Sequence, residues 1–141
     1  MTGPYKGSCL CGEIRFEVDE FLSTIGHCHC SMCRKFHGAA FATLADVPAE
    51  HFRWTAGEHL LKGYTAQNGT IRRFCINCGS SLTFFTPNGP SDIVEIAMGC
   101  FDDDVPVKAN AHIFVASGAN WFEHEDELPH FEAGRRSRQI K

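Results

Sequence analysis

Apolar and polar residues alternate over short stretches of this chain, and a period of two predicts β-strands. In EIRFEV (13–18), the apolar residues Ile14, Phe16 and Val18 alternate with charged ones, which would place the apolar side chains on one buried face. Further stretches are short, rich in β-branched or aromatic residues and bounded by turn-forming residues. They are AAFATL (39–44), HLLKGYT (59–65), SLTFFT (81–86), DIVEIAM (92–98) and AHIFVA (111–116).

Helical periodicity is not sustained for three turns anywhere in the chain. One short helix is predicted at SMCRKFHG (31–38), where Gly38 would end it. A single turn is predicted at VPAEHF (47–52), with Pro48 near its start. The pattern therefore indicates a mainly β protein of short antiparallel strands, in which the cysteines fall between strands. Residues 5–131 are expected to form a single domain, followed by a basic tail at 132–141.

The length and net charge of the chain restrict the classes of function that it can have. A chain of 141 residues with 43% apolar residues can bury a core without needing disulfides. The net charge of -4 argues against a nucleic-acid partner. The four basic residues of GRRSRQIK (134–141) are expected to lie in a solvated, frayed end rather than in a binding arm.

The expected compartment is the cytoplasm. No apolar run approaches the roughly 20 residues of a membrane span, and MTGPYKGSCL does not have the pattern of a secretory signal. In a reducing compartment, eight cysteines point to metal binding or catalysis rather than to disulfides.

The most specific cysteine motif is CINCG, which contains Cys75 and Cys78. Two cysteines separated by two residues and followed by glycine form a zinc knuckle, which supplies two of the four ligands of a structural zinc. The other two can come from Cys9 and Cys11 in CLC, if CLC begins a strand and residues i and i+2 share a face. The alternative is that the CLC cysteines are small buried apolar residues.

A second group of cysteines is the triplet in HCHCSMC, made of Cys28, Cys30 and Cys33. The triplet supplies three ligands to an ion that usually takes four, and an open fourth position is typical of catalytic zinc. The fourth ligand could instead be Cys100, which we expect to be a bystander, or one of the neighbouring His27 and His29. Strand alternation places the two histidines on the face opposite Cys28 and Cys30.

Three thiolates make zinc a weak Lewis acid but a good partner for soft ligands such as sulfur. We therefore expect the open position to take an external thiol and to hold it as a thiolate. Arg34 and Lys35 directly follow the triplet and could meet substrate carboxylates, or could simply be solvated. His37 is a candidate acid or base for an aldehyde oxygen, although a single histidine is more often structural.

Together, the motifs GSCLCGEIRFEV, CHCSMCRKFHGAAF, FCINCGSSL and HIFVASGANWFE, in this order, resemble the glutathione-dependent formaldehyde-activating enzyme family, also described by its centromere-protein-V-type domain. The resemblance runs from about Tyr5 to Phe131. It implies a β-tent zinc-binding fold. It also implies a structural zinc at the CxC and CxxC cysteines and a second zinc at the triplet.

The resemblance further implies carbon–sulfur lyase chemistry, in which glutathione and formaldehyde combine reversibly to give S-hydroxymethylglutathione. The expected cofactors are two zinc ions per chain, with the second partly occupied, and the expected partners are glutathione or another small thiol and its aldehyde adduct. The alternative function is a non-catalytic zinc-binding interaction module. A thiol redox protein is disfavoured, because the CxxC pair has no surrounding βαβ pattern. The sequence does not specify the oligomeric state.

Overall fold

The computed structural model describes residues 3–87, 89 and 92–141, and these divide into two compact units. The first unit comprises the residues up to Ser23 and Ala45–Val107, and the second comprises Thr24–Leu44 and Lys108–Lys141. The described residues form ten strands, one α-helix and four 3-10 turns. The mainly β class expected from the sequence is confirmed.

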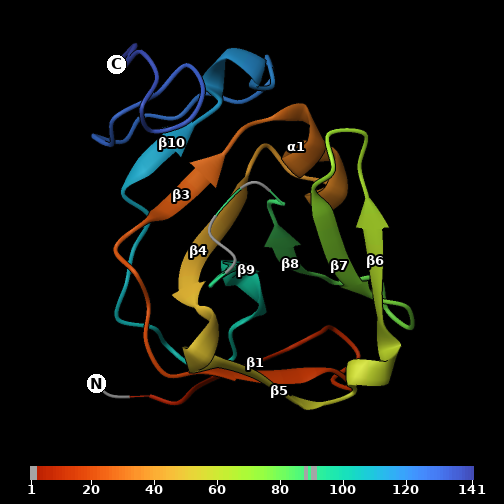
Figure 1. Ribbon diagram of the computed structural model, residues 1–141. Helices are drawn as coiled ribbons and strands as arrows, with labels where there is room; N and C mark the ends of the chain where they lie inside the picture. Colours follow the sequence, from red (N-terminus) through yellow and green to blue (C-terminus); the bar gives the residue numbers. More distant parts are fainter. Residues whose placement is uncertain (1–2, 88, 90–91) are drawn as a thin grey trace. The chain divides into compact units, whose positions relative to one another are not determined.

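The first unit contains two groups of antiparallel strands. One is a three-stranded sheet in the order β1-β2-β5, and the other runs β6-β7-β8-β9, with β6, β7 and β8 side by side in Figure 1. The strands are β1 (Tyr5–Ser8), β2 (Arg15–Val18), β5 (Phe52–Ala56), β6 (Leu61–Thr65), β7 (Ile71–Cys75), β8 (Ser81–Phe85) and β9 (Ile93–Ala97). The 3-10 turns of this unit are Ala49–His51, Glu58–Leu60 and Met98–Cys100.

The core of the first unit forms around the alternating residues of β2. Phe16 is 1% exposed, and its ring lies 5.3 Å from the Phe101 ring and 5.7 Å from the Phe52 ring. Ile14 and Val18 are fully buried, whereas Arg15 is exposed. The period of two in the sequence therefore predicted the buried face correctly.

The second unit contains β3 (Ile25–Cys28), helix α1 (Ser31–His37), β10 (Ala111–Ile113) and the 3-10 turn Val115–Ser117. Strand β4 (Ala42–Pro48) has residues in both units. β10 pairs with β3 in parallel (Figure 1), which departs locally from the antiparallel pairing expected. Gly38 has φ 61° and caps α1 by donating its N–H to the Arg34 carbonyl oxygen, so the predicted helix end is confirmed.

The C-terminal residues are hydrogen-bonded, so the expectation of a frayed end was wrong. The His130 N–H donates to the Lys141 carbonyl oxygen at 2.8 Å, and the Glu132 N–H donates to the Arg138 carbonyl oxygen at 2.9 Å. This end folds back along residues 130–132, and the local composition did not reveal that pairing. In the described part of the chain, no helix has the length and apolar character that crossing a membrane requires.

One carboxyl group in the first unit lies in an unfavourable environment. Burial, aided by the nearby charge of Asp46, raises the pKa of Glu95 to about 7 from an ordinary value of 4.5. The Thr86 hydroxyl and the Arg72 guanidinium oppose this rise without cancelling it. The folded state therefore holds a proton on Glu95 that the unfolded state loses at lower pH.

We expect the Glu95→Gln variant to lose part of the pH dependence of stability. Because the folded-state pKa of Glu95 is raised, its stabilising effect is present below about pH 4.5 and is lost as the pH rises through about 7. The unfolding free energy of the wild type should fall relative to that of the variant by about 1 to 3 kcal/mol over this range. Urea unfolding of both proteins across the range measures the difference, and parallel curves would contradict the assignment.

Candidate metal centres

The first cysteine group is positioned by two turns of the first unit. Cys9 and Cys11 lie in the turn between β1 and β2, where the Gly12 N–H donates to the Cys9 carbonyl oxygen at 3.0 Å. The expectation that CLC begins a strand was therefore wrong. A turn nevertheless brings the two Sγ atoms within 3.5 Å of each other.

The second turn is the predicted knuckle. Cys75 ends β7, and the Gly79 N–H donates to the Cys75 carbonyl oxygen at 2.8 Å. Gly79 has φ 82°, in the left-handed region that favours glycine. The chain therefore reverses tightly and directs the Cys78 sulfur back towards Cys75.

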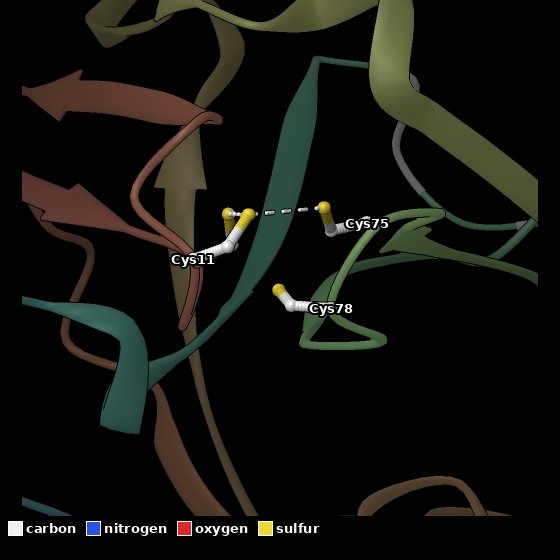
Figure 2. A group of neighbouring side chains, drawn as sticks. Cys11, Cys75 and Cys78 are labelled. Atoms are coloured by element: carbon white, nitrogen blue, oxygen red, sulfur yellow. Dashed lines mark hydrogen bonds between the residues drawn. The ribbon is translucent and has the colours of Figure 1, made fainter.

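The four sulfurs of Cys9, Cys11, Cys75 and Cys78 all lie within 4.8 Å of one another. The Cys11 and Cys75 Sγ atoms are 3.9 Å apart, and Figure 2 shows the side chains of Cys11, Cys75 and Cys78 turned towards a shared space. Zn–S bonds of about 2.3 Å in a tetrahedron place sulfurs about 3.8 Å apart. This spacing fits a zinc ion held by four thiolates, and it disfavours the alternative that Cys9 and Cys11 serve only as apolar packing.

The environments of these sulfurs differ. Burial raises the pKa of the Cys9 thiol to about 11, even though the Ile14 N–H donates to its sulfur at 3.3 Å. Burial also acts to raise the pKa of Cys78, but hydrogen bonding to Ser80 and to neighbouring groups outweighs it and lowers the pKa to about 5. Four thiolates this close repel one another, so full deprotonation requires a cation among them.

The second group lies at the start of α1. Cys28 ends β3, Cys30 is the N-cap residue of α1, and Cys33 is buried in the first turn of the helix. The Cys33 N–H donates to the Cys30 sulfur at 3.2 Å, and the three sulfurs lie within 4.8 Å of one another. Hydrogen bonds with Cys30 and Cys33, together with burial, raise the pKa of the Cys28 thiol. This geometry also fits zinc, with three soft ligands.

The neighbours of this triplet differ in exposure. Lys35 is exposed, whereas Arg34 is half-buried and its Nε atom is buried without a hydrogen-bond partner among the described residues. Arg34 therefore has an unused donor close in sequence to the cysteines. His37 is half-buried near the end of α1.

The residues considered for the fourth ligand have other partners. The His29 Nε2 atom lies 2.7 Å from His112 Nδ1, and the His27 Nδ1 atom lies 2.7 Å from Thr43 Oγ1. In the first unit, the Cys100 thiol donates to the Ser81 carbonyl oxygen at 3.2 Å, and burial raises its pKa to about 11. Among the described metal-binding side chains, none joins the sulfurs of Cys28, Cys30 and Cys33 within 4.8 Å.

Sequence reasoning missed a cluster of histidines in the second unit. It brings together His29, His112, His124 and His130 with the carboxylate of Asp126. His29 and His112 are 2% and 1% exposed, and burial lowers the pKa of His29 to about 4. The sequence gives little sign of this cluster. The pairing of β10 with β3 brings together His29 and His112, which are 83 positions apart in the chain.

The sequence of this chain matches a known protein family over most of its length. The family described as glutathione-dependent formaldehyde-activating enzyme matches residues 4–117. The chain belongs to this family. The resemblance seen in the sequence motifs is therefore confirmed over most of the chain.

Similar proteins carry related names. A protein of Halomonas elongata, provisionally named as a glutathione-dependent formaldehyde-activating enzyme, is 31% identical over 131 residues, which covers 85% of this chain and 80% of that protein. An uncharacterized lyase of Schizosaccharomyces pombe is 29% identical over 85 residues, or 60% of each chain. A crystal structure of a Rhodobacter sphaeroides protein is 26% identical, with a TM-score of 0.60, and the alignment covers 72% of this chain and 91% of that one.

We expect the Cys78→Ser variant to lose one zinc ion per chain and several kcal/mol of unfolding free energy, because zinc binding to a closed site contributes to folding. Cys100→Ser is the matched control, since a serine hydroxyl can also donate to the Ser81 carbonyl oxygen. Metal analysis and thermal unfolding measure both effects. A zinc content in Cys78→Ser equal to that of the wild-type protein would rule out the four-thiolate site.

Proposed function

We propose that the protein is a zinc-dependent carbon–sulfur lyase that acts on adducts between glutathione, or another small thiol, and small aldehydes such as formaldehyde. The observation that carries this proposal is the triplet of Cys28, Cys30 and Cys33, whose three sulfurs converge with no fourth ligand within 4.8 Å in the described chain. Membership of the family and the name of the Halomonas elongata protein support the reaction class.

Each cysteine of the triplet has its own task in this proposal. Cys28 and Cys33 are buried and fix two corners of the site, while half-buried Cys30 lies towards solvent. Zinc held by these sulfurs would supply the positive charge that keeps an incoming thiol deprotonated. The proposed complement of the two cysteine groups is two zinc ions per chain, with the closed group of four cysteines serving structure.

The proposed reaction is balanced without an oxidant or a reductant. In one direction the thiol sulfur attacks the carbonyl carbon, a carbon–sulfur bond forms, and the proton lost by the thiol is balanced by one gained at the aldehyde oxygen. In the other direction the hydroxyl loses its proton, the carbon–sulfur bond breaks and the thiol leaves. Arg34 is the better candidate for orienting a glutathione carboxylate, because its Nε is buried and lacks a partner among the described residues, whereas Lys35 is exposed.

The alternative function is a non-catalytic zinc module, in which Cys100 or a histidine would close the triplet. The bonds of Cys100 to Ser81 and of His29 to His112 favour the lyase, because both groups already have partners. The proposed location is the cytoplasm, since the eight cysteines are all free and need reducing conditions to remain so.

We expect reduced glutathione to bind the two-zinc protein and to bind Cys30→Ser at least about tenfold more weakly. Serine preserves the N-cap of α1 at this position, so the variant should keep its fold while losing a soft ligand. Calorimetric titration with a phosphine reductant measures binding, and Cys100→Ser is the control. Equal binding by Cys30→Ser, or no binding by the two-zinc protein, would contradict a thiol site at the triplet.

The same three proteins test the reaction itself. The two-zinc protein and Cys100→Ser should accelerate the exchange between formaldehyde and its glutathione adduct, whereas Cys30→Ser should not. Exchange spectroscopy by NMR with labelled formaldehyde measures the rate over the uncatalysed background. Glutathione binding without acceleration would support the thiol site while contradicting this aldehyde as the substrate.

A further inference from the structure

We propose that the second unit carries a cation site separate from both cysteine groups. Its ligands are His112 Nε2, Asp126 Oδ2 and His130 Nε2, and its ion is a borderline divalent cation such as Zn²⁺ or Co²⁺. The three residues offer ligand atoms that lie within 4.8 Å of one another. This site goes beyond the proposed lyase function and does not depend on it.

The side chain of His130 is oriented as a metal ligand. Its Nδ1–H donates to the Leu128 carbonyl oxygen at 2.7 Å, so the neutral ring carries its lone pair on Nε2. His130 is 3% exposed, and its Nε2 is buried without a hydrogen-bond partner among the described residues. A buried acceptor without a donor is costly, and a cation would remove that cost.

Asp126 is held by the backbone of Leu128, the residue that also orients His130. The Leu128 N–H donates to Asp126 Oδ1 at 3.1 Å, which leaves Oδ2 to face His112 Nε2 at 2.8 Å. Leu128 therefore orients the carboxylate with its N–H and the imidazole of His130 with its carbonyl oxygen. Two ligands of the site are fixed by one short loop.

The third ligand is set beside this loop by β-type pairing. The His112 N–H donates to the Pro129 carbonyl oxygen, the Phe131 N–H donates to the His112 carbonyl oxygen, and His112 forms a parallel bridge with His130. On the other side of the ring, His112 Nδ1 lies 2.7 Å from His29 Nε2. With Nε2 on the cation, Nδ1–H would donate to His29, an outer hydrogen bond that is common for metal-bound histidines.

The ligand chemistry differs from that of the cysteine groups. Two imidazoles and one carboxylate suit zinc, cobalt, nickel or ferrous iron rather than soft ions, and three protein ligands leave room for water. The distance of 2.8 Å between His112 Nε2 and Asp126 Oδ2 must open by about 0.5 Å to surround such an ion. Asp126 is 42% exposed, so the site has access to solvent.

A competing arrangement would use His29, His112 and His124, whose ligand atoms also lie within 4.8 Å of one another. His124 is less buried than His130, and its ring stacks on the His130 ring at 4.2 Å. The set with Asp126 is favoured because its carboxylate supplies a negative charge against the cation and because the orientation of His130 is fixed by its bond to Leu128.

The test is titration of Co²⁺ into protein whose cysteines have been saturated with zinc and which has been dialysed against a weak chelator. We expect one Co²⁺ per chain with visible d–d bands and without the sulfur-to-cobalt charge-transfer bands of thiolate sites. If the site keeps zinc through dialysis, the zinc count should be three per chain. No extra ion, or cobalt bound only with charge-transfer bands, would overturn the proposal.

The variants Asp126→Asn and His130→Gln identify the ligands, with His124→Gln as the matched control. The first two should lower the Co²⁺ affinity at least about tenfold, or remove the third zinc ion, while His124→Gln leaves both unchanged. Circular dichroism and the zinc content of the cysteine sites verify folding. If His130→Gln does not fold, the Co²⁺ affinity of Asp126→Asn decides the test, because the Asp126 side chain is exposed. Unchanged binding in Asp126→Asn, or loss in His124→Gln only, would overturn the assignment.

Discussion

The first unit depends on the convergence of four sulfurs that two separate turns bring together. Cys9 and Cys75 belong to the buried core that also contains Phe16 and Leu82, so the sulfurs are part of the packing of this unit. Thiolates at these distances repel one another, and protons or a cation must neutralise them. A metal ion bound by the four sulfurs would link the turn after β1 to the end of β7. The backbone hydrogen bonds of these two strands do not make that link by themselves.

The two cysteine groups differ in how the chain builds them, and this difference supports their proposed roles. The group of four draws on two segments that are far apart in sequence, so a metal there would close a long loop. The triplet comes from six consecutive residues, 28–33, around the start of α1. A metal bound by such a local group would contribute less to folding, and an open fourth position would leave it free for chemistry.

The sequence was most informative where spacing alone determines geometry. The CxxCG knuckle needs only one turn and Gly79, and the alternation around Phe16 predicted the buried face of β2. Strands β1, β5 and β7 were not predicted, because their short segments do not alternate clearly, and β3 was predicted only through the strand alternation assumed for residues 27–30. The histidine cluster could not be predicted, because it depends on β10 pairing in parallel with β3 and on the loop from Asp126 to His130. Single histidines in the sequence gave no sign of that proximity.

We propose that one cysteine group closes around its ion and that the other leaves a position open. X-ray absorption at the zinc edge, on two-zinc protein prepared with a phosphine reductant, counts the sulfur ligands of both ions. We expect an average of about 3.5 sulfur ligands per zinc, rising to about 4 when glutathione is added. An average of 4 before any thiol is added, or no change on adding it, would contradict the open site.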